Sequence, residues 1–122
     1  MSIILYGIPN CDQVKKARTW LSDHAVSVEF HDYKKAGITS ALINKWLQHD
    51  STDWQSLLNK RGTTWRKLSE AEQAKVIDET SAIACMVQSP SLIKRPVLVI
   101  QQEQKLEVVV GFSEEKYQSL FP

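Results

Sequence analysis

Hydrophobic positions near the N-terminus predict a strand followed by a helix. An apolar run from Ile3 to Tyr6 is closed by the turn residues Gly7 and Pro9. Beyond it, apolar side chains recur at the spacing of a helix with one buried face, at Val14, Ala17, Trp20 and Leu21. The turn between the two elements contains Cys11, which therefore lies at or near the first turn of the helix.

A second strand is predicted over residues 25–32. Val26, Val28 and Phe30 alternate there with polar residues, which is the period-two pattern of a half-buried strand. Strand, helix and strand make a βαβ unit, whose two strands are parallel. His31 falls on the polar side, so we expect a surface or strand-end histidine and not a ligand.

The middle of the chain has helical patterns separated by polar breaks. A polar connection is predicted over 32–37 and a break over 50–53. The first predicted helix is capped by Thr39 or Ser40 and runs to about Gln48, and a short second helix contains Trp54, Leu57 and Leu58 and ends at Gly62. A third helix begins with the capping-box pattern of residues 69–72 and runs to about Glu79, and a short fourth helix is capped by Ser81.

The C-terminal part returns to strands. An apolar strand is predicted over 97–100 and another over 105–111, and the polar loop 102–105 makes the pair antiparallel. Ser113 is placed to cap a last helix that carries Tyr117 in the core. Strand-rich ends around a helical middle fit a domain that contains both helices and a sheet.

Composition narrows the class of protein. The 122 residues suit one domain with a real core, and the net charge of +1 gives no reason to expect nucleic acid or a membrane as a partner. No membrane-spanning stretch, signal peptide or metal-type Cys/His spacing is recognisable. With two cysteines far apart in the sequence, we expect reduced thiols in the cytoplasm.

Cys11 has the strongest candidate chemistry. Unpaired N–H groups at a helix N-terminus favour an anion, and the thiolate is the reactive form of cysteine. Lys15 could add positive charge or be an ordinary surface lysine, whereas Asp12 disfavours the thiolate. From the pattern alone, the alternative that Cys11 is a small buried apolar residue is the commoner case for a free cysteine. Cys85 follows an apolar helical face, so we expect an inert thiol; the alternative, a resolving cysteine, requires its Cα within about 7 Å of that of Cys11.

Two segments resemble motifs of one known family. Residues 8–17, which read Ile-Pro-Asn-Cys-Asp-Gln-Val-Lys-Lys-Ala, and residues 92–99, which read Leu-Ile-Lys-Arg-Pro-Val-Leu-Val, are similar to the arsenate reductase (ArsC)/Spx family, and in particular to its YffB-like branch. The resemblance covers nearly the whole chain. It implies a single α/β domain over 1–122, with a thioredoxin-like mixed sheet flanked by helices and a helical insertion at roughly 38–88.

The resemblance also implies roles for single residues. Pro96 matches the cis-proline that lies beside the active cysteine, although a trans bond would be expected without the resemblance. Arg95 matches an arginine that stabilises the thiolate and binds an oxyanion, as a guanidinium group is suited to do.

The sequence departs from the arsenate reductase pattern at several positions. Gly7 stands in place of the helping histidine, Arg61 matches the second arginine only approximately, and residues 110–112 contain no arginine for the third. Val14 stands where Spx-type regulators carry a second cysteine, so no switch between paired cysteines is expected.

The predicted function is that of a glutathione-dependent, single-cysteine thiol oxidoreductase. Cys11 and Arg95 are the predicted catalytic residues, and the predicted substrate-binding residues are Lys15, Arg61, Pro96 and Asn10. Glutathione, or a protein disulfide together with it, would be the substrate of a monomer with no metal and no tightly bound cofactor. The alternatives are an Spx-like regulator that binds RNA polymerase without chemistry, and a weak arsenate reductase.

Overall fold

Four strands form one mixed sheet in the order β2–β1–β3–β4. The computed structural model describes residues 1–49 and 52–122. The strands are β1 (Ser2–Gly7), β2 (Glu29–Asp32), β3 (Val97–Gln102) and β4 (Lys105–Val110). β1 runs parallel to β2 and antiparallel to β3, and β3 forms a hairpin with β4. The predicted βαβ unit and the predicted antiparallel hairpin are both confirmed.

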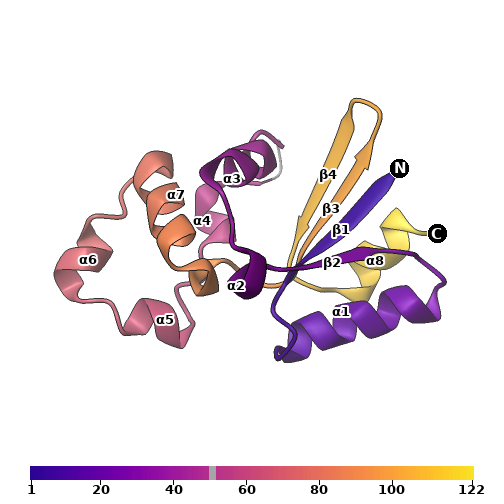
Figure 1. Ribbon diagram of the computed structural model, residues 1–122, viewed down its shortest axis with the longest axis horizontal. Helices are drawn as coiled ribbons and strands as arrows, with labels where there is room; N and C mark the ends of the chain where they lie inside the picture. Colours follow the sequence, from indigo (N-terminus) through magenta and orange to yellow (C-terminus); the bar gives the residue numbers. More distant parts are fainter. Residues whose placement is uncertain (50–51) are drawn as a thin grey trace.

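Helices occupy both sides of this sheet (Figure 1). They are α1 (Asp12–Asp23), α2 (Tyr33–Ala36), α3 (Ser40–Leu47), α4 (Trp54–Leu57), α5 (Thr63–Arg66), α6 (Glu70–Ala74), α7 (Glu79–Gln88), the 3₁₀ helix η1 (Pro90–Leu92) and α8 (Glu114–Leu120). In Figure 1, α1 and α8 lie together beside the strands, while α3 to α7 form a separate group on the other side. The predicted mixed sheet with a helical middle is confirmed. No helix in the described ranges is long and apolar enough to cross a bilayer.

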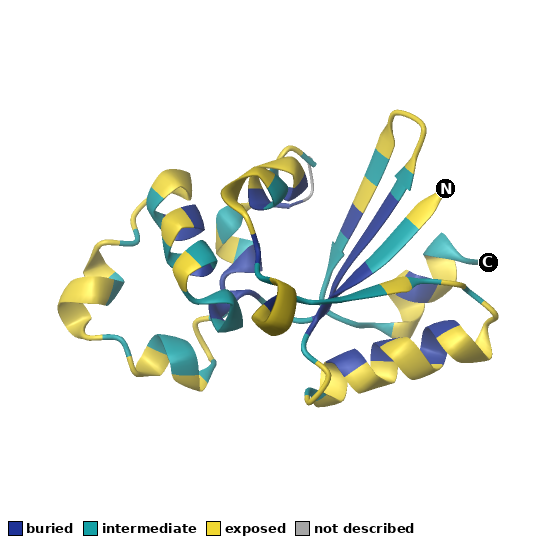
Figure 2. Ribbon diagram, in the orientation of Figure 1, coloured by how far each residue is buried: buried dark blue, intermediate teal, exposed yellow. Residues whose placement is uncertain are grey.

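The two faces of the sheet belong to two hydrophobic clusters. Tyr6 and Val99 pack with the helical middle, whereas Leu5 and Leu98 pack with α1 and α8. Neighbouring residues of one strand point to opposite faces, which explains this division. Figure 2 shows buried positions along the central strands and on the side of α1 that faces them.

The second strand is shorter than predicted. β2 begins at Glu29, because the chain leaving α1 is still bonded to that helix: the amide of Ala25 donates to Ser22 (3.1 Å) and that of Val26 to Leu21 (2.9 Å). Ala25 takes the left-handed conformation, with φ 57°. The apolar alternation at 26–28 therefore reflects packing against the α1–α8 cluster and not strand pairing.

The residues between β2 and α3 differ from the prediction of a purely polar connection. They contain α2, whose N-terminus is capped by the side chain of Asp32, which accepts from the amides of Lys34 (3.1 Å) and Lys35 (3.3 Å). Its first residue, Tyr33, is 1% exposed. Thr39 then caps α3 as predicted. The break predicted over 50–53 lies partly outside the described residues.

The end of the helix predicted at Gly62 is wrong. α4 ends at Leu57, because the backbone of Leu58 is extended and pairs in an antiparallel bridge with Ile93. Gly62 instead lies at the N-terminus of α5. A long-range pairing, which no local pattern encodes, ended the helix.

The capping box predicted for α6 is confirmed, because Glu72 donates its amide to the Ser69 hydroxyl (3.1 Å). The helix nevertheless ends at Ala74, well before the predicted end. The next helix, α7, is capped by Asp78 and not by Ser81. Ser81 is the third residue of that helix and completes a second capping box, with its amide 2.9 Å from the Asp78 carboxylate. The C-terminal helix, α8, is capped by Ser113 as predicted.

Candidate active site

Cys11 is the N-cap residue of α1. Its backbone is extended (φ −139°, ψ 126°), and its carbonyl accepts the amide of Lys15 at 2.9 Å. β1 delivers the chain to this point, and the parallel crossover then carries α1 along the sheet. The predicted place of Cys11, at the first turn of the helix, is confirmed. The residue is neither fully buried nor fully exposed.

The surroundings of the Cys11 sulfur favour its thiolate. Partial burial acts to raise the pKa of the thiol, but the amide of Val14, the guanidinium of Arg95 and the amide of Gln13 outweigh it and hold the pKa below its ordinary value. Neither amide completes a full hydrogen bond to the sulfur in this structure. They act as oriented dipoles at the helix N-terminus, where a negative charge is stabilised.

Arg95 reaches Cys11 from the other end of the chain. It lies between η1 and β3, two residues before Val97, which pairs with Tyr6 on β1. Its Nη1 donates to the carbonyl of Ser91 at 3.1 Å. Burial alone would lower the pKa of Arg95, but the sulfur of Cys11 beside it raises the value, so the guanidinium stays charged.

The Arg95–Pro96 peptide bond is cis. Pro96 is buried, and its carbonyl accepts the amide of Gly111 at 2.8 Å, so it continues the β3–β4 ladder by one further bond. The bond stands just beyond the Tyr6–Val97 pair, at the end of β1 from which the chain continues to Cys11.

Gly7 lies at a close approach of β1 to α1. A Cβ on Gly7 would lie 2.7 Å from Cγ2 of Val14, which is fully buried on α1. A residue with a side chain at this position would therefore have to displace the Val14 side chain.

Replacing Gly7 with alanine is therefore expected to destabilise the protein by about 1–3 kcal/mol, the usual cost of overpacking. Urea unfolding of the variant measures this loss. The matched comparison makes the same change in a Val14→Ala background, where the clashing methyl group is gone and the cost should shrink. An equal cost in both backgrounds would show that the Val14 contact is not its cause.

Tyr33 is a site residue that the sequence prediction missed. Its hydroxyl donates to the carbonyl of Ile93 at 3.2 Å, and its oxygen lies against the guanidinium of Arg95. Burial raises the pKa of Tyr33 far above its ordinary value, so the hydroxyl stays protonated. One signal was present in the sequence: Tyr33 follows the second parallel strand directly, and residues that follow neighbouring parallel strands meet at one edge of the sheet.

The other predicted residues lie differently. Asn10 and Lys15 are exposed beside Cys11, but the charge of Lys15 is not among the causes that shift the pKa of Cys11. Arg61 is also exposed, its amide donates to the side chain of Asn59 (3.1 Å), and no described contact joins it to the site. Cys85 on α7 is a free, partly buried thiol whose pKa is raised by burial.

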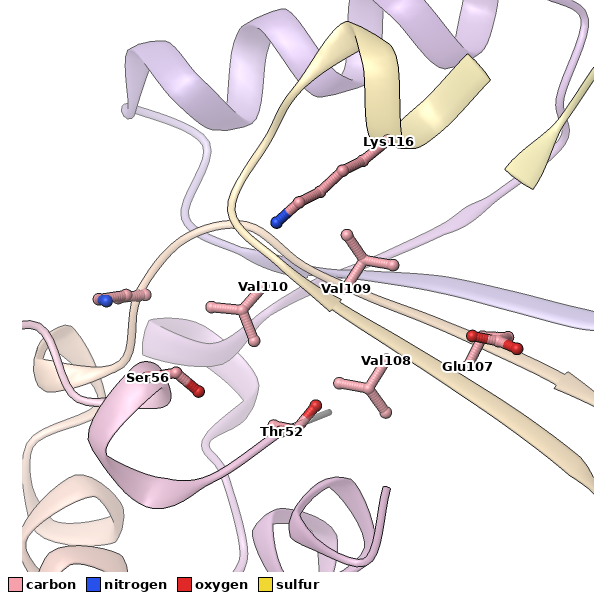
Figure 3. A pocket seen from close by; sticks show the side chains of 8 residues that line it. Thr52, Ser56, Glu107, Val108, Val109, Val110 and Lys116 are labelled. Atoms are coloured by element: carbon pink, nitrogen blue, oxygen red, sulfur yellow. The ribbon is translucent and has the colours of Figure 1, made fainter. Parts of the chain in front are cut away.

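A hollow opens between the helical middle and the edge strand β4 (Figure 3). It is lined by Thr52, Ser56, Lys94, Glu107, Val108, Val109, Val110 and Lys116. Neither Cys11 nor Arg95 lines it. Val110, one of the positions where the third arginine of arsenate reductases is missing, is here an apolar wall residue. Within the described part of the chain, no three His, Cys, Asp or Glu side chains gather into a metal site.

The chain is similar to known proteins over nearly its whole length. The profile of the ArsC family matches residues 6–120. A solved structure of a protein named YffB (PA3664) is similar over 99% of this chain and 100% of its own length, at 44% identity and a TM-score of 0.86. This likeness in sequence and shape therefore covers the sheet, the helical middle and both segments of the site.

Two further relatives are similar at lower identity, and the second of them has a longer chain. An uncharacterised protein of Haemophilus influenzae is 39% identical over 98% of both chains. The global transcriptional regulator Spx of Streptococcus agalactiae is 25% identical over 98% of this chain and 83% of its own. The shared region thus occurs both alone and with additional residues.

Proposed function

This chain belongs to the ArsC family, and we propose that it is a glutathione-dependent thiol oxidoreductase in which Cys11 is the only reacting cysteine. One observation carries the proposal: Cys11 is an N-cap thiol whose pKa is lowered by Arg95 and by the amides of Gln13 and Val14. The lowered pKa increases the fraction of Cys11 that is present as thiolate, and the thiolate is the species that attacks a disulfide.

The proposed reaction has three thiol–disulfide exchange steps, two of which take place at Cys11. The Cys11 thiolate attacks one sulfur of a substrate disulfide, which forms a mixed disulfide on Cys11 and releases the other sulfur as a thiolate. A glutathione thiolate then attacks this mixed disulfide and restores Cys11 as thiolate, with the remaining substrate sulfur joined to glutathione. A second glutathione frees that sulfur and leaves as glutathione disulfide. Two glutathione molecules thus supply the two electrons that reduce the substrate.

Arg95 has two tasks in this scheme. Its charge stabilises the Cys11 thiolate, both before attack and when that thiolate is the leaving group. We assign the binding of a glutathione carboxylate to Arg95 with the exposed Lys15, while Arg61 lacks any described contact that would bring it to the site. The Pro96 carbonyl already accepts the amide of Gly111, so we assign hydrogen bonding with the glutathione backbone to the main chain of Arg95. The exposed Asn10 would contact glutathione beside Cys11.

Mass spectrometry of the protein treated with glutathione disulfide tests the proposal. We expect one glutathione per chain, attached to the peptide that contains Cys11, and its release by added glutathione. The reduction of a small disulfide, coupled to glutathione reductase, should then depend on the glutathione concentration. An adduct on Cys85 alone, or no adduct, would contradict the proposed role of Cys11.

A second candidate is an Spx-like regulator that binds RNA polymerase without chemistry. The similarity to an Spx global transcriptional regulator over 98% of this chain favours it. Val14 stands where such regulators carry a second cysteine, so regulation here would not use a disulfide between these positions. Capture of RNA polymerase subunits by the Cys11→Ser variant as efficiently as by the wild type would support this candidate.

A third candidate, weak arsenate reduction, has less support from the site. Among the described residues, Arg95 alone contributes a guanidinium group beside Cys11, while Arg61 is exposed and Val110 lines the hollow beside β4. An arsenate anion would therefore lack most of the charged hydrogen-bond donors that planar arginine groups supply. We expect arsenate to be turned over far more slowly than a disulfide.

A further inference from the structure

Tyr33 is buried directly behind the arginine of the site. It is 1% exposed and follows β2 immediately, at the end of the sheet where Asp32 pairs with Gly7 of β1. Its ring therefore reaches from one edge strand under the segment that precedes β3. A hydroxyl placed this deeply needs polar partners, since an unbonded buried hydroxyl is costly.

The hydroxyl of Tyr33 has one hydrogen-bond partner and one charged neighbour. Its proton is donated to the carbonyl of Ile93 at 3.2 Å. Because the proton is directed to Ile93, the lone pairs of the oxygen are left for the neighbouring guanidinium of Arg95, which donates and cannot accept. The tyrosine oxygen is thus a fixed acceptor for this arginine.

The guanidinium of Arg95 is held on several sides. The Nη1 of Arg95 donates to the carbonyl of Ser91 at 3.1 Å. The oxygen of Tyr33 and the sulfur of Cys11 are the other two neighbours of the guanidinium group. Its Nε is buried without a hydrogen-bond partner in the described structure. The orientation of the group therefore depends on the contacts of its Nη groups, and loss of one of them would loosen the group.

We infer that Tyr33 is a positioning residue, which holds the guanidinium of Arg95 against the sulfur of Cys11. Because the hydroxyl of Tyr33 stays neutral, it does not form an ion pair with Arg95. The positive charge of Arg95 therefore remains available to stabilise the Cys11 thiolate. The inference rests on the proposed function in one respect, because that function is the reason why Arg95 must lie beside Cys11. The contact itself, and its effect on the thiol, can be measured without glutathione.

The test is a double-mutant cycle read through the pKa of Cys11. Alkylation of Cys11 by iodoacetamide is followed against pH in a Cys85→Ala background, for Tyr33→Phe, Arg95→Ala and the double variant. We expect Tyr33→Phe to raise the pKa, and to slow alkylation about threefold at a fixed pH below it, as for the loss of one hydrogen bond. In the double variant, Tyr33→Phe should add nothing to the effect of Arg95→Ala.

Tyr117 provides a matched control. It is also fully buried, but its hydroxyl has no partner in the described structure, and it packs in the α1–α8 cluster. Tyr117→Phe should leave the alkylation curve unchanged. An unchanged curve for Tyr33→Phe, an equal shift for Tyr117→Phe, or full additivity with Arg95→Ala would each overturn the inference.

The unaltered protein offers a second measurement, which holds even if Tyr33→Phe does not fold. A guanidinium held on several sides rotates slowly, so the Nη protons of Arg95 should give separate NMR signals. One averaged signal would overturn the inference. Absence of glutathione-dependent turnover together with the expected alkylation cycle would instead refute the proposed function and leave the role of Tyr33 standing.

Discussion

Replacing Cys11 with serine is expected to abolish glutathione-dependent reduction of a disulfide. The serine hydroxyl can occupy the same N-cap position and is a good capping group, so the fold should be retained. The serine hydroxyl does not form a stable anion near neutral pH and does not form a disulfide, so both exchange steps that take place at Cys11 are lost. The coupled assay with glutathione reductase measures the loss, and the thermal midpoint checks that the variant is folded.

The second cysteine gives the matched control for this experiment. Cys85 lies on α7, and its thiol has a pKa raised by burial, which is opposite to that of Cys11. Cys85→Ser should therefore keep the wild-type rate. If Cys11→Ser remained active while Cys85→Ser lost activity, the assignment of the reacting cysteine would be wrong; if neither change mattered, the chain would not be a cysteine-dependent reductase.

Replacing Arg95 with alanine is expected to slow the alkylation of Cys11 about tenfold at a fixed pH below its pKa. The guanidinium is the only charged group among the causes that lower this pKa, while the amides of Gln13 and Val14 remain in the variant. The pKa of Cys11 should therefore rise without losing all of its depression. A tenfold change corresponds to about one pKa unit, which is a usual effect of one nearby opposite charge.

The sign of this effect fixes its dependence on pH. In the wild type the lowered pKa makes thiolate available at lower pH, so the curve of rate against pH should move to higher pH in Arg95→Ala. Well above both pKa values the two proteins should react at similar rates. Lys15→Ala is the control, because Lys15 is exposed and does not contribute to the pKa shift. Coincident curves for Arg95→Ala and the wild type would contradict the role of the arginine.

Local sequence patterns predicted the elements that local contacts determine. The turn from β1 into α1 depends on the glycine–proline turn and on the apolar face of the helix, so Cys11 could be placed at the helix N-terminus from the sequence. The hairpin of β3 and β4 and the cap of α8 at Ser113 are similarly local. Each of these features lies within a few residues of its cause.

Contacts between distant segments could not be predicted from patterns of this kind. Leu58 leaves its helix because it pairs with Ile93, and Tyr33 is buried because its ring packs in the cluster that contains Ile93, to whose carbonyl its hydroxyl donates. In the sequence, Tyr33 looks like part of a polar connection, since lysines and a glycine follow it. Arg95 was identified through a family resemblance, whereas physical reasoning from the sequence alone left it as an ordinary surface arginine.

The pairing of β1 with β3 also has a consequence during synthesis. Leu5 pairs with Leu98, almost the whole length of the chain away, so Arg95 joins Cys11 only after most of the protein has been made. Before that, α1 is a single short helix, which is marginally stable in water on its own. In the unfinished chain, Arg95 therefore makes no contribution to the pKa of Cys11. That contribution begins only when β3 pairs with β1 and closes the sheet.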